Sequence, residues 1–154
     1  MKVALLLVFF SVLFSACSES KNEKKEPVPE TETKITEPAS FDGCYEMVIS
    51  GDTAFMKLTQ SGDSLAGDLR YKRKEKDSNI GNVVLKKIDS RGEGYYTFQS
   101  EGKTSVRQII FKINGSSFAE GYGDIEMKND TAVLKYPHAL NFEEKHPFNK
   151  VTCK

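Results

Sequence analysis

The sequence predicts an all-β protein: an antiparallel up-and-down β-barrel of about eight strands, followed by a short C-terminal helical turn. Over residues 41–136, apolar and polar residues alternate with the period of two that is typical of strands. Turn-forming residues interrupt this alternation at intervals of roughly eight to twelve residues. No connection offers the dozen or so residues that a parallel crossover needs, so we expect consecutive strands to pair antiparallel.

Eight segments carry the strand pattern, and the third shows it most clearly. There Leu65, Leu69 and Tyr71 fall on one face, whereas Asp68 and Arg70 fall on the other. Alternate residues of each strand are therefore expected to face one core. The expected strands span residues 44–50, 53–60, 64–73, 79–88, 94–101, 104–113, 116–127 and 131–136.

Short turns rich in Gly, Asn and Asp separate these strands, among them Gly51-Asp52, residues 91–93 and Asn129-Asp130. Such turns are a strong local signal of a hairpin. Closing the strands into a barrel would leave no exposed edge and would place the first and last strands side by side. An open sandwich of two sheets is the alternative. The outward faces carry Lys, Arg and Asp, which argues against a barrel that spans a membrane.

The C-terminal stretch, residues 137–153, breaks the strand pattern. Pro147 limits any helix that precedes it, so we expect a helical turn over residues 139–145. Phe142 and Phe148 would then plug one end of the barrel.

The composition fits one ordinary domain in 154 residues. Lys and Arg number 22, as do Asp and Glu, so the formal net charge is zero. Without a net positive field, binding to nucleic acid is not expected. The basic run over residues 70–74 is soon followed by Glu75 and Asp77, and we interpret it as a solvated hairpin.

The N-terminus has the pattern of an export signal. Lys2 precedes a mostly apolar run over residues 3–16, which is shorter than the roughly 20 residues of a membrane-spanning helix. The sequence FSAC at residues 14–17 resembles the lipobox of bacterial lipoproteins, which usually have Leu where this chain has Phe14. The resemblance implies a signal peptide over residues 1–16 and a lipid on Cys17. A plain secretory signal is the alternative.

Residues 17–40 are expected to be the lipidated cysteine and a disordered tether. Glu and Lys dominate the stretch after Cys17, which also holds three prolines and few large aliphatic residues. Such a segment cannot bury enough apolar surface to offset its ordering entropy. A solvated linker is the favoured interpretation, and an acidic export signal is the alternative. Residues 41–154 then form the barrel domain.

The cysteine count points to one disulfide. If lipid occupies Cys17, then Cys44 and Cys153 remain, near the two ends of the expected domain. An oxidising envelope compartment favours a bond between them. A metal site is not expected, because the chain has no CxxC motif and its two histidines lie in the C-terminal stretch.

The chain as a whole resembles a family of small envelope lipoproteins of Bacteroidetes-type bacteria over residues 41–153. The resemblance is carried by GCYEMV at 43–48, LRYKRKEKDSN at 69–79, the stretch over residues 96–112 and EGYGDIE at 120–126. It implies a lipid anchor in the bacterial cell envelope, at the outer membrane, with the periplasmic and surface faces both open; it implies no activity. The expected architecture is also similar to calycin-like barrels that hold small apolar ligands.

One constellation predicts a binding site. Arg107 shares a face with the apolar residues of the strand over residues 104–113, and Glu120, Tyr122 and Asp124 share a face of the next strand. If both faces point inward, Arg107 needs a carboxylate partner, which Glu120 or Asp124 could supply. Two aromatic residues of one face, Tyr96 and Phe98, are candidates to line the same space.

Two alternatives to this binding site remain open. Arg107 and Glu120 could form a purely structural pair or lie exposed. The inward face of the strand is also ambiguous, because Val106, Gln108 and Ile110 form a rival face.

No segment predicts an enzyme or a cofactor site. There is no GxSxG sequence, and His138 and His146 are interpreted as surface or capping residues. We expect a monomeric, non-enzymatic lipoprotein that binds a small apolar ligand or an envelope protein. The alternative is an inhibitor-like module that blocks an external hydrolase through the charged loop over residues 72–79.

Overall fold

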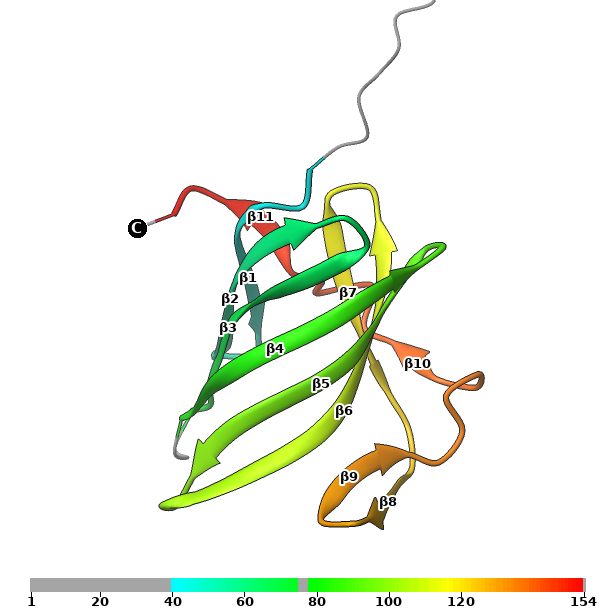
Figure 1. The fold of residues 1–154 in the computed structure, drawn as a ribbon. Helices are drawn as coiled ribbons and strands as arrows, with labels where there is room; N and C mark the ends of the chain where they lie inside the picture. Colours follow the sequence, from blue (N-terminus) through cyan, green and yellow to red (C-terminus); the bar gives the residue numbers. More distant parts are fainter. Residues whose placement is uncertain (1–39, 75–77, 154) are drawn as a thin grey trace, which may run out of the picture. The chain divides into compact units, whose positions relative to one another are not determined.

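The computed structural model describes residues 40–74 and 78–153, which form an all-β fold without helices (Figure 1). Their strands belong to one mostly antiparallel sheet of eleven strands. The strands are β1 (Gly43–Ile49), β2 (Asp52–Ser61), β3 (Ser64–Lys72), β4 (Asn79–Ile88), β5 (Arg91–Ser100), β6 (Lys103–Asn114), β7 (Ser117–Tyr122), β8 (Ile125–Lys128), β9 (Thr131–Leu134), β10 (Asn141–Phe142) and β11 (Asn149–Val151).

Consecutive strands from β1 to β7 pair antiparallel, as predicted. At the ends of the order, β11 pairs with β1 and β10 pairs with β7. The expectation that every pair is antiparallel was wrong, because β9 pairs in parallel with β6 at Val106–Thr131 and Arg107–Ala132. The chain between them, which contains β7 and β8, supplies the crossover that the sequence pattern concealed.

The sheet has more strands than expected and is not closed. The expected strand over residues 116–127 is interrupted at Gly123 and Asp124, where the chain leaves β6 and turns into the β8–β9 hairpin. Between β7 and the segment that leads into β11, an isolated bridge joins Phe118 and Phe148. Their main chains exchange hydrogen bonds of 3.0 and 2.8 Å.

The expected helical turn over residues 139–145 was also wrong. Asn141 and Phe142 form β10 instead, opposite Tyr122 and Gly121 of β7. The main-chain N–H of Glu143 continues this contact by donating to the carbonyl oxygen of residue 120. The free edge of β7 needs main-chain partners, and an extended C-terminal segment satisfies them where a helix could not.

Tight turns connect the hairpins. Both residues have positive φ in Ser50-Gly51 and in Asn129-Asp130, as the hairpin turns that follow the sheet twist require. The turn expected over residues 91–93 lies instead just before β5, where Asp89 takes a φ of 52°. Asp tolerates this conformation because its short side chain can bond locally, so the chain needs no glycine there.

One cluster of buried side chains fills the concave side of the sheet. The ambiguity of β6 is resolved, because Ile109, Phe111 and Ile113 belong to this cluster, on the face that also carries Arg107. Phe148 is fully buried in the cluster. Phe142 does not plug the core. A Cβ placed on Gly121 would meet the Phe142 ring, so this ring lies over the outer side of β7. The other large, fully buried residues of the cluster are Tyr45, Met56, Leu58, Leu65, Leu69, Leu85, Tyr96 and Phe118.

The predicted disulfide between Cys44 and Cys153 is present, with 5.2 Å between the two Cα atoms. It joins β1 to the residues just after β11 across a separation of 109 residues. The expected signal peptide (1–16), the lipidated Cys17 and the tether up to residue 39 lie outside the described residues. Nowhere in the described part of the chain is there a helix long and apolar enough to cross a membrane.

Candidate functional site

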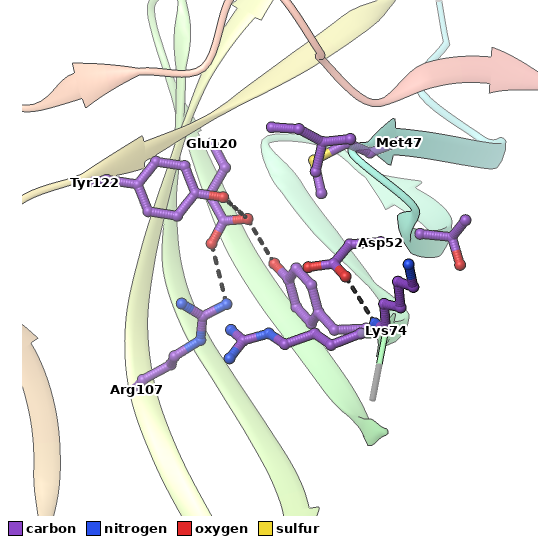
Figure 2. A pocket seen from close by; sticks show the side chains of 10 residues that line it. Met47, Asp52, Lys74, Arg107, Glu120 and Tyr122 are labelled. Atoms are coloured by element: carbon purple, nitrogen blue, oxygen red, sulfur yellow. Dashed lines mark hydrogen bonds and ion pairs between the residues drawn. The ribbon is translucent and has the colours of Figure 1, made fainter. Parts of the chain in front are cut away.

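A cavity of about 290 Å³ lies at one end of the sheet (Figure 2). Strands β1, β2, β3, β6 and β7 contribute to its wall, together with the two residues that follow β3. Charged and phenolic side chains meet apolar ones there, as in ligand sites of proteins. The lining residues are Met47, Ile49, Asp52, Thr53, Tyr71, Arg73, Lys74, Arg107, Glu120 and Tyr122.

An ion pair between neighbouring strands forms one side of the cavity. Arg107 Nη2 on β6 lies 3.0 Å from Glu120 Oε1 on β7. The Glu120 side chain is 1% exposed, whereas that of Arg107 is 30% exposed and can be reached from the cavity. A buried carboxylate is costly to keep charged unless it is paired and hydrogen-bonded, which this arrangement achieves.

Two phenols complete the hydrogen bonding of Glu120 (Figure 2). The Tyr71 hydroxyl donates to Glu120 Oε2 at 2.7 Å, and the Tyr122 hydroxyl donates to the same oxygen at 3.2 Å. With Arg107 on Oε1, the carboxylate therefore accepts from three side chains. Little of its acceptor capacity is left for another group.

The phenols of the site hold their protons at neutral pH. Burial, followed by the nearby charge of Glu120, raises the pKa of Tyr71 well above its ordinary value. The same two causes raise the pKa of Tyr122. Burial raises the pKa of Tyr96 to about 12. All three therefore act as hydrogen-bond donors.

Aromatic rings support the guanidinium of Arg107. Its central carbon lies 5.2 Å from the ring centre of Tyr71 and 5.6 Å from that of Tyr96. Tyr96 is itself held by its hydroxyl, which donates to the Leu69 carbonyl oxygen at 3.0 Å. Phe98 stacks on Tyr96 with 4.7 Å between ring centres. The two predicted aromatic residues thus lie behind Arg107, and neither of them lines the cavity.

No family model, curated protein or solved structure matches the chain. The chemistry of the cavity is therefore inferred from its own residues.

Of the two predicted carboxylate partners, the structure pairs Arg107 with Glu120 and not with Asp124. Asp124 lies beyond the end of β7 and is exposed. Its main-chain oxygen accepts a hydrogen bond from the Lys135 N–H at 2.8 Å, which holds the start of the β8–β9 hairpin. Asp124 is not part of the cavity wall.

Several lining residues were missed by the sequence reasoning, above all Tyr71, Arg73 and Lys74. The basic run was interpreted as a solvated hairpin, and Arg70 and Lys72 are indeed exposed. Tyr71 gave a usable signal, because it ends the inward row of β3, where a hydroxyl can reach a buried acid. The turn of the chain after β3, which brings Arg73 and Lys74 to the cavity, had no such signal.

The residues present favour binding by charge and hydrogen bonds. Arginine, lysine, carboxylate and tyrosine side chains make up most of the cavity wall. Within residues 40–74 and 78–153, no group of three or more His, Cys, Asp or Glu side chains is placed to hold a metal ion.

Proposed function

We propose that this chain is a lipid-anchored envelope lipoprotein whose sheet domain binds a small ligand without chemical conversion. The observation that carries the proposal is the cavity at one end of the sheet, with the buried Glu120 and the reachable Arg107 in its wall. Ligand sites commonly combine a concave surface with a few converging polar groups. At about 290 Å³ this cavity suits a small molecule and not a long acyl chain.

The proposal includes a barrel-like arrangement of eight strands, β1–β7 and β11. The strand order runs from β7 through β1 to β11, and the Phe118–Phe148 bridge links the segment before β11 to β7. Barrels of this size have an interior that side chains can fill, with room for one small ligand. The large aromatic core fills most of this interior, so the ligand is assigned to the end where Arg107 and Glu120 lie.

Lipid anchoring at the outer membrane is the second part of the proposal. It is supported by the lipobox-like sequence over residues 14–17 and by the charged, proline-containing stretch that follows. Two or more acyl chains give a stable anchor where a single chain would be marginal. The charged loop of the inhibitor-like alternative includes residues 75–77, which lie outside the described ranges.

Native mass spectrometry of the full chain, purified from the envelope of cells that make it, tests ligand binding. We expect a fraction of the protein to carry one small molecule. Ile49→Trp, at the cavity wall, should remove that added mass, whereas Val48→Trp at the neighbouring exposed position of β1 should retain it. Protein without added mass from cells and after incubation with a small-molecule library would refute ligand binding.

Mass spectrometry of the membrane fraction tests the anchor independently. We expect the mature chain to begin at Cys17 with acyl groups attached, and Cys17→Ala to leave the membrane fraction. An unmodified N-terminus at Cys17 would refute lipid anchoring and leave the ligand site untouched.

A further inference from the structure

The inference concerns the class of ligand and rests on the proposed function. We infer that the cavity binds a small organic monocarboxylate. Its carboxylate lies among Arg107, Arg73 and Lys74, and its apolar part lies against Met47 and Ile49.

The charge of the cavity wall supports an anion. Three cationic side chains, Arg73, Lys74 and Arg107, face two carboxylates, Asp52 and Glu120. The wall therefore carries one more positive than negative charge. Charges of like sign that share a poorly solvated space repel, and a bound anion relieves this repulsion.

Both carboxylates already have partners. Glu120 accepts from Arg107, Tyr71 and Tyr122, and is almost fully buried. Asp52 Oδ1 accepts from the main-chain N–H of Lys74 at 2.7 Å, which fixes the chain after β3 (Figure 2). These acids thus organise the wall, and they leave the cationic groups as its remaining hydrogen-bond donors.

Arg107 is prepared to bind a second carboxylate. A guanidinium has five N–H donors, and Glu120 is bonded to one nitrogen, Nη2. The rings of Tyr71 and Tyr96 hold the guanidinium plane in place, so little side-chain entropy is lost on binding. Planar, fixed guanidinium groups are well suited to carboxylates.

Arg73 and Lys74 provide positive charge from the other wall. Lys74 lies across the cavity from Arg107 in Figure 2. Across residues 40–74 and 78–153, neither Arg73 nor Lys74 forms a side-chain ion pair. The Asp52 hydrogen bond sets the backbone position of Lys74, and both residues belong to the cavity wall.

The size and remaining surface of the cavity define the rest of the ligand. Met47 is 6% exposed and Ile49 packs against the core, so they form an apolar patch in an otherwise polar wall. One negative charge balances the excess charge of the wall, whereas a dianion would exceed it. These features together favour a monocarboxylate with a short apolar part.

Isothermal titration calorimetry of the full chain with benzoate, and with benzamide as its neutral isostere, tests the charge requirement. We expect benzoate to bind at least about tenfold more tightly than benzamide, because charge-assisted hydrogen bonds are stronger than neutral ones. Added NaCl should weaken benzoate binding and leave benzamide binding unchanged. Chemical shifts of Arg107 and Tyr122 in NMR spectra should report the binding position.

Arg73→Gln and Arg70→Gln form a matched pair of variants. Both remove one exposed arginine at or near β3, but Arg70 lies in a groove on the outer face with Phe55 and Ile80. Arg73→Gln should weaken benzoate binding by about threefold to fivefold, and Arg70→Gln by less than about twofold. Neither residue is in the core, so both variants should fold.

Specific outcomes would overturn the inference. Equal binding of benzoate and benzamide, equal effects of the two variants, or tighter binding of inorganic phosphate than of benzoate would each refute a monocarboxylate. Benzoate that fails to bind, while native mass spectrometry finds another molecule that Ile49→Trp excludes, would refute the ligand class and retain the proposed function. Absence of both would refute both.

Discussion

Glu120 is a buried charged side chain in the described fold, with 2% of its surface exposed. Its environment consists of one guanidinium and two phenols. These three donors come from three different strands. Burial of a charge is tolerated only when its partners replace the lost hydration. The stability of this end of the sheet therefore depends on one carboxylate.

Glu120→Gln should lower the free energy of unfolding by about 2 kcal/mol. The substitution keeps the shape of the side chain but leaves Arg107 without its counter-ion and weakens the two phenolic hydrogen bonds. Urea denaturation of oxidised protein measures the effect. Glu144→Gln is the control, because the Lys112–Glu144 pair is solvent-exposed and should contribute nothing measurable. Equal effects of the two substitutions would contradict the assigned role of Glu120.

Tyr96 makes the free energy of unfolding depend on pH in the alkaline range. The folded state raises the pKa of this phenol to about 12, from an ordinary value of 10.0. The folded state thus keeps a proton that the unfolded chain releases above pH 10. Its contribution to stability is complete below about pH 10 and is lost as the pH rises from 10 to 12.

Tyr96→Phe should therefore reduce the loss of stability between pH 9 and pH 11.5 by about 2 kcal/mol. The variant also lacks the hydrogen bond to Leu69, which lowers stability equally at both pH values. Tyr95→Phe, at a half-exposed neighbouring position, is the control for the removal of one phenol. If the free energy of unfolding falls equally with pH in the wild type and in Tyr96→Phe, this assignment is contradicted.

A carboxylate partner for Arg107 could be predicted at this scale, and the choice of partner could not. Alternation and charge offered Glu120 and Asp124, but the hairpin register sets Glu120 opposite Phe111, so the pairing with Arg107 depends on how the two strands diverge. Tyr71 lies 49 residues from Glu120, and only the curvature of the whole sheet brings its hydroxyl there. Ile110 shows why the inward face of β6 stayed ambiguous: it is fully buried although it lies on the outer side.

At the scale of the strands, the sharp bending of β3, β4 and β5 depends on glycine. A Cβ on Gly67 would overlap the Lys57 carbonyl oxygen of the paired strand, and one on Gly94 would overlap that of Val84. The requirement is steric, because neither residue has positive φ. Glycine in a strand interior commonly marks such a close approach of two backbones.

Gly67→Ala should destabilise the fold by at least about 2 kcal/mol, because the backbones of β2 and β3 would have to separate. Gly102→Ala is the matched control: its φ is +73° and no atom lies within 4 Å of the added Cβ. It should cost only about 1 kcal/mol, from the backbone conformation. Guanidinium denaturation of both variants measures the difference, and a smaller loss for Gly67→Ala would contradict the bending argument.

The strands themselves were largely predictable, because buried and exposed residues alternate along β2, β3 and β4 and the hairpin turns are short. Prediction failed where the chain pairs with distant segments. The β9 strand pairs with β6 in parallel, and β10 forms only because the edge of β7 needs partners. The local sequence pattern does not indicate these contacts between distant segments. It therefore predicted a helical turn over residues 139–145.

At the scale of the whole molecule, the Cys44–Cys153 bond encloses nearly all of the described fold. A cross-link of this span removes much of the freedom of the unfolded chain. It also joins β1 to the end of β11, a strand of three residues that pairs along one edge only. Such a short strand depends on the disulfide for its position.

The double variant Cys44→Ala/Cys153→Ala should lose about 2–4 kcal/mol of stability in urea denaturation. Hydrogen exchange should rise first at Lys150 and Val151, because their pairing with β1 is no longer tethered. Dithiothreitol should shift the wild-type transition to that of the variant and leave the variant unchanged. A wild-type transition insensitive to reduction would show that the bond contributes no stability.

The same bond determines how the domain responds to mechanical load. Residues 40 and 153 are connected through this bond, because Ser40 lies four residues before Cys44, which is bonded to Cys153. The Lys150 ammonium also donates to the Ser40 carbonyl oxygen at 3.2 Å. A force applied at these two residues passes through the covalent bond. Such a force therefore cannot separate the hairpins one after another. Under tension between these two points, the domain should stay folded until the disulfide is reduced.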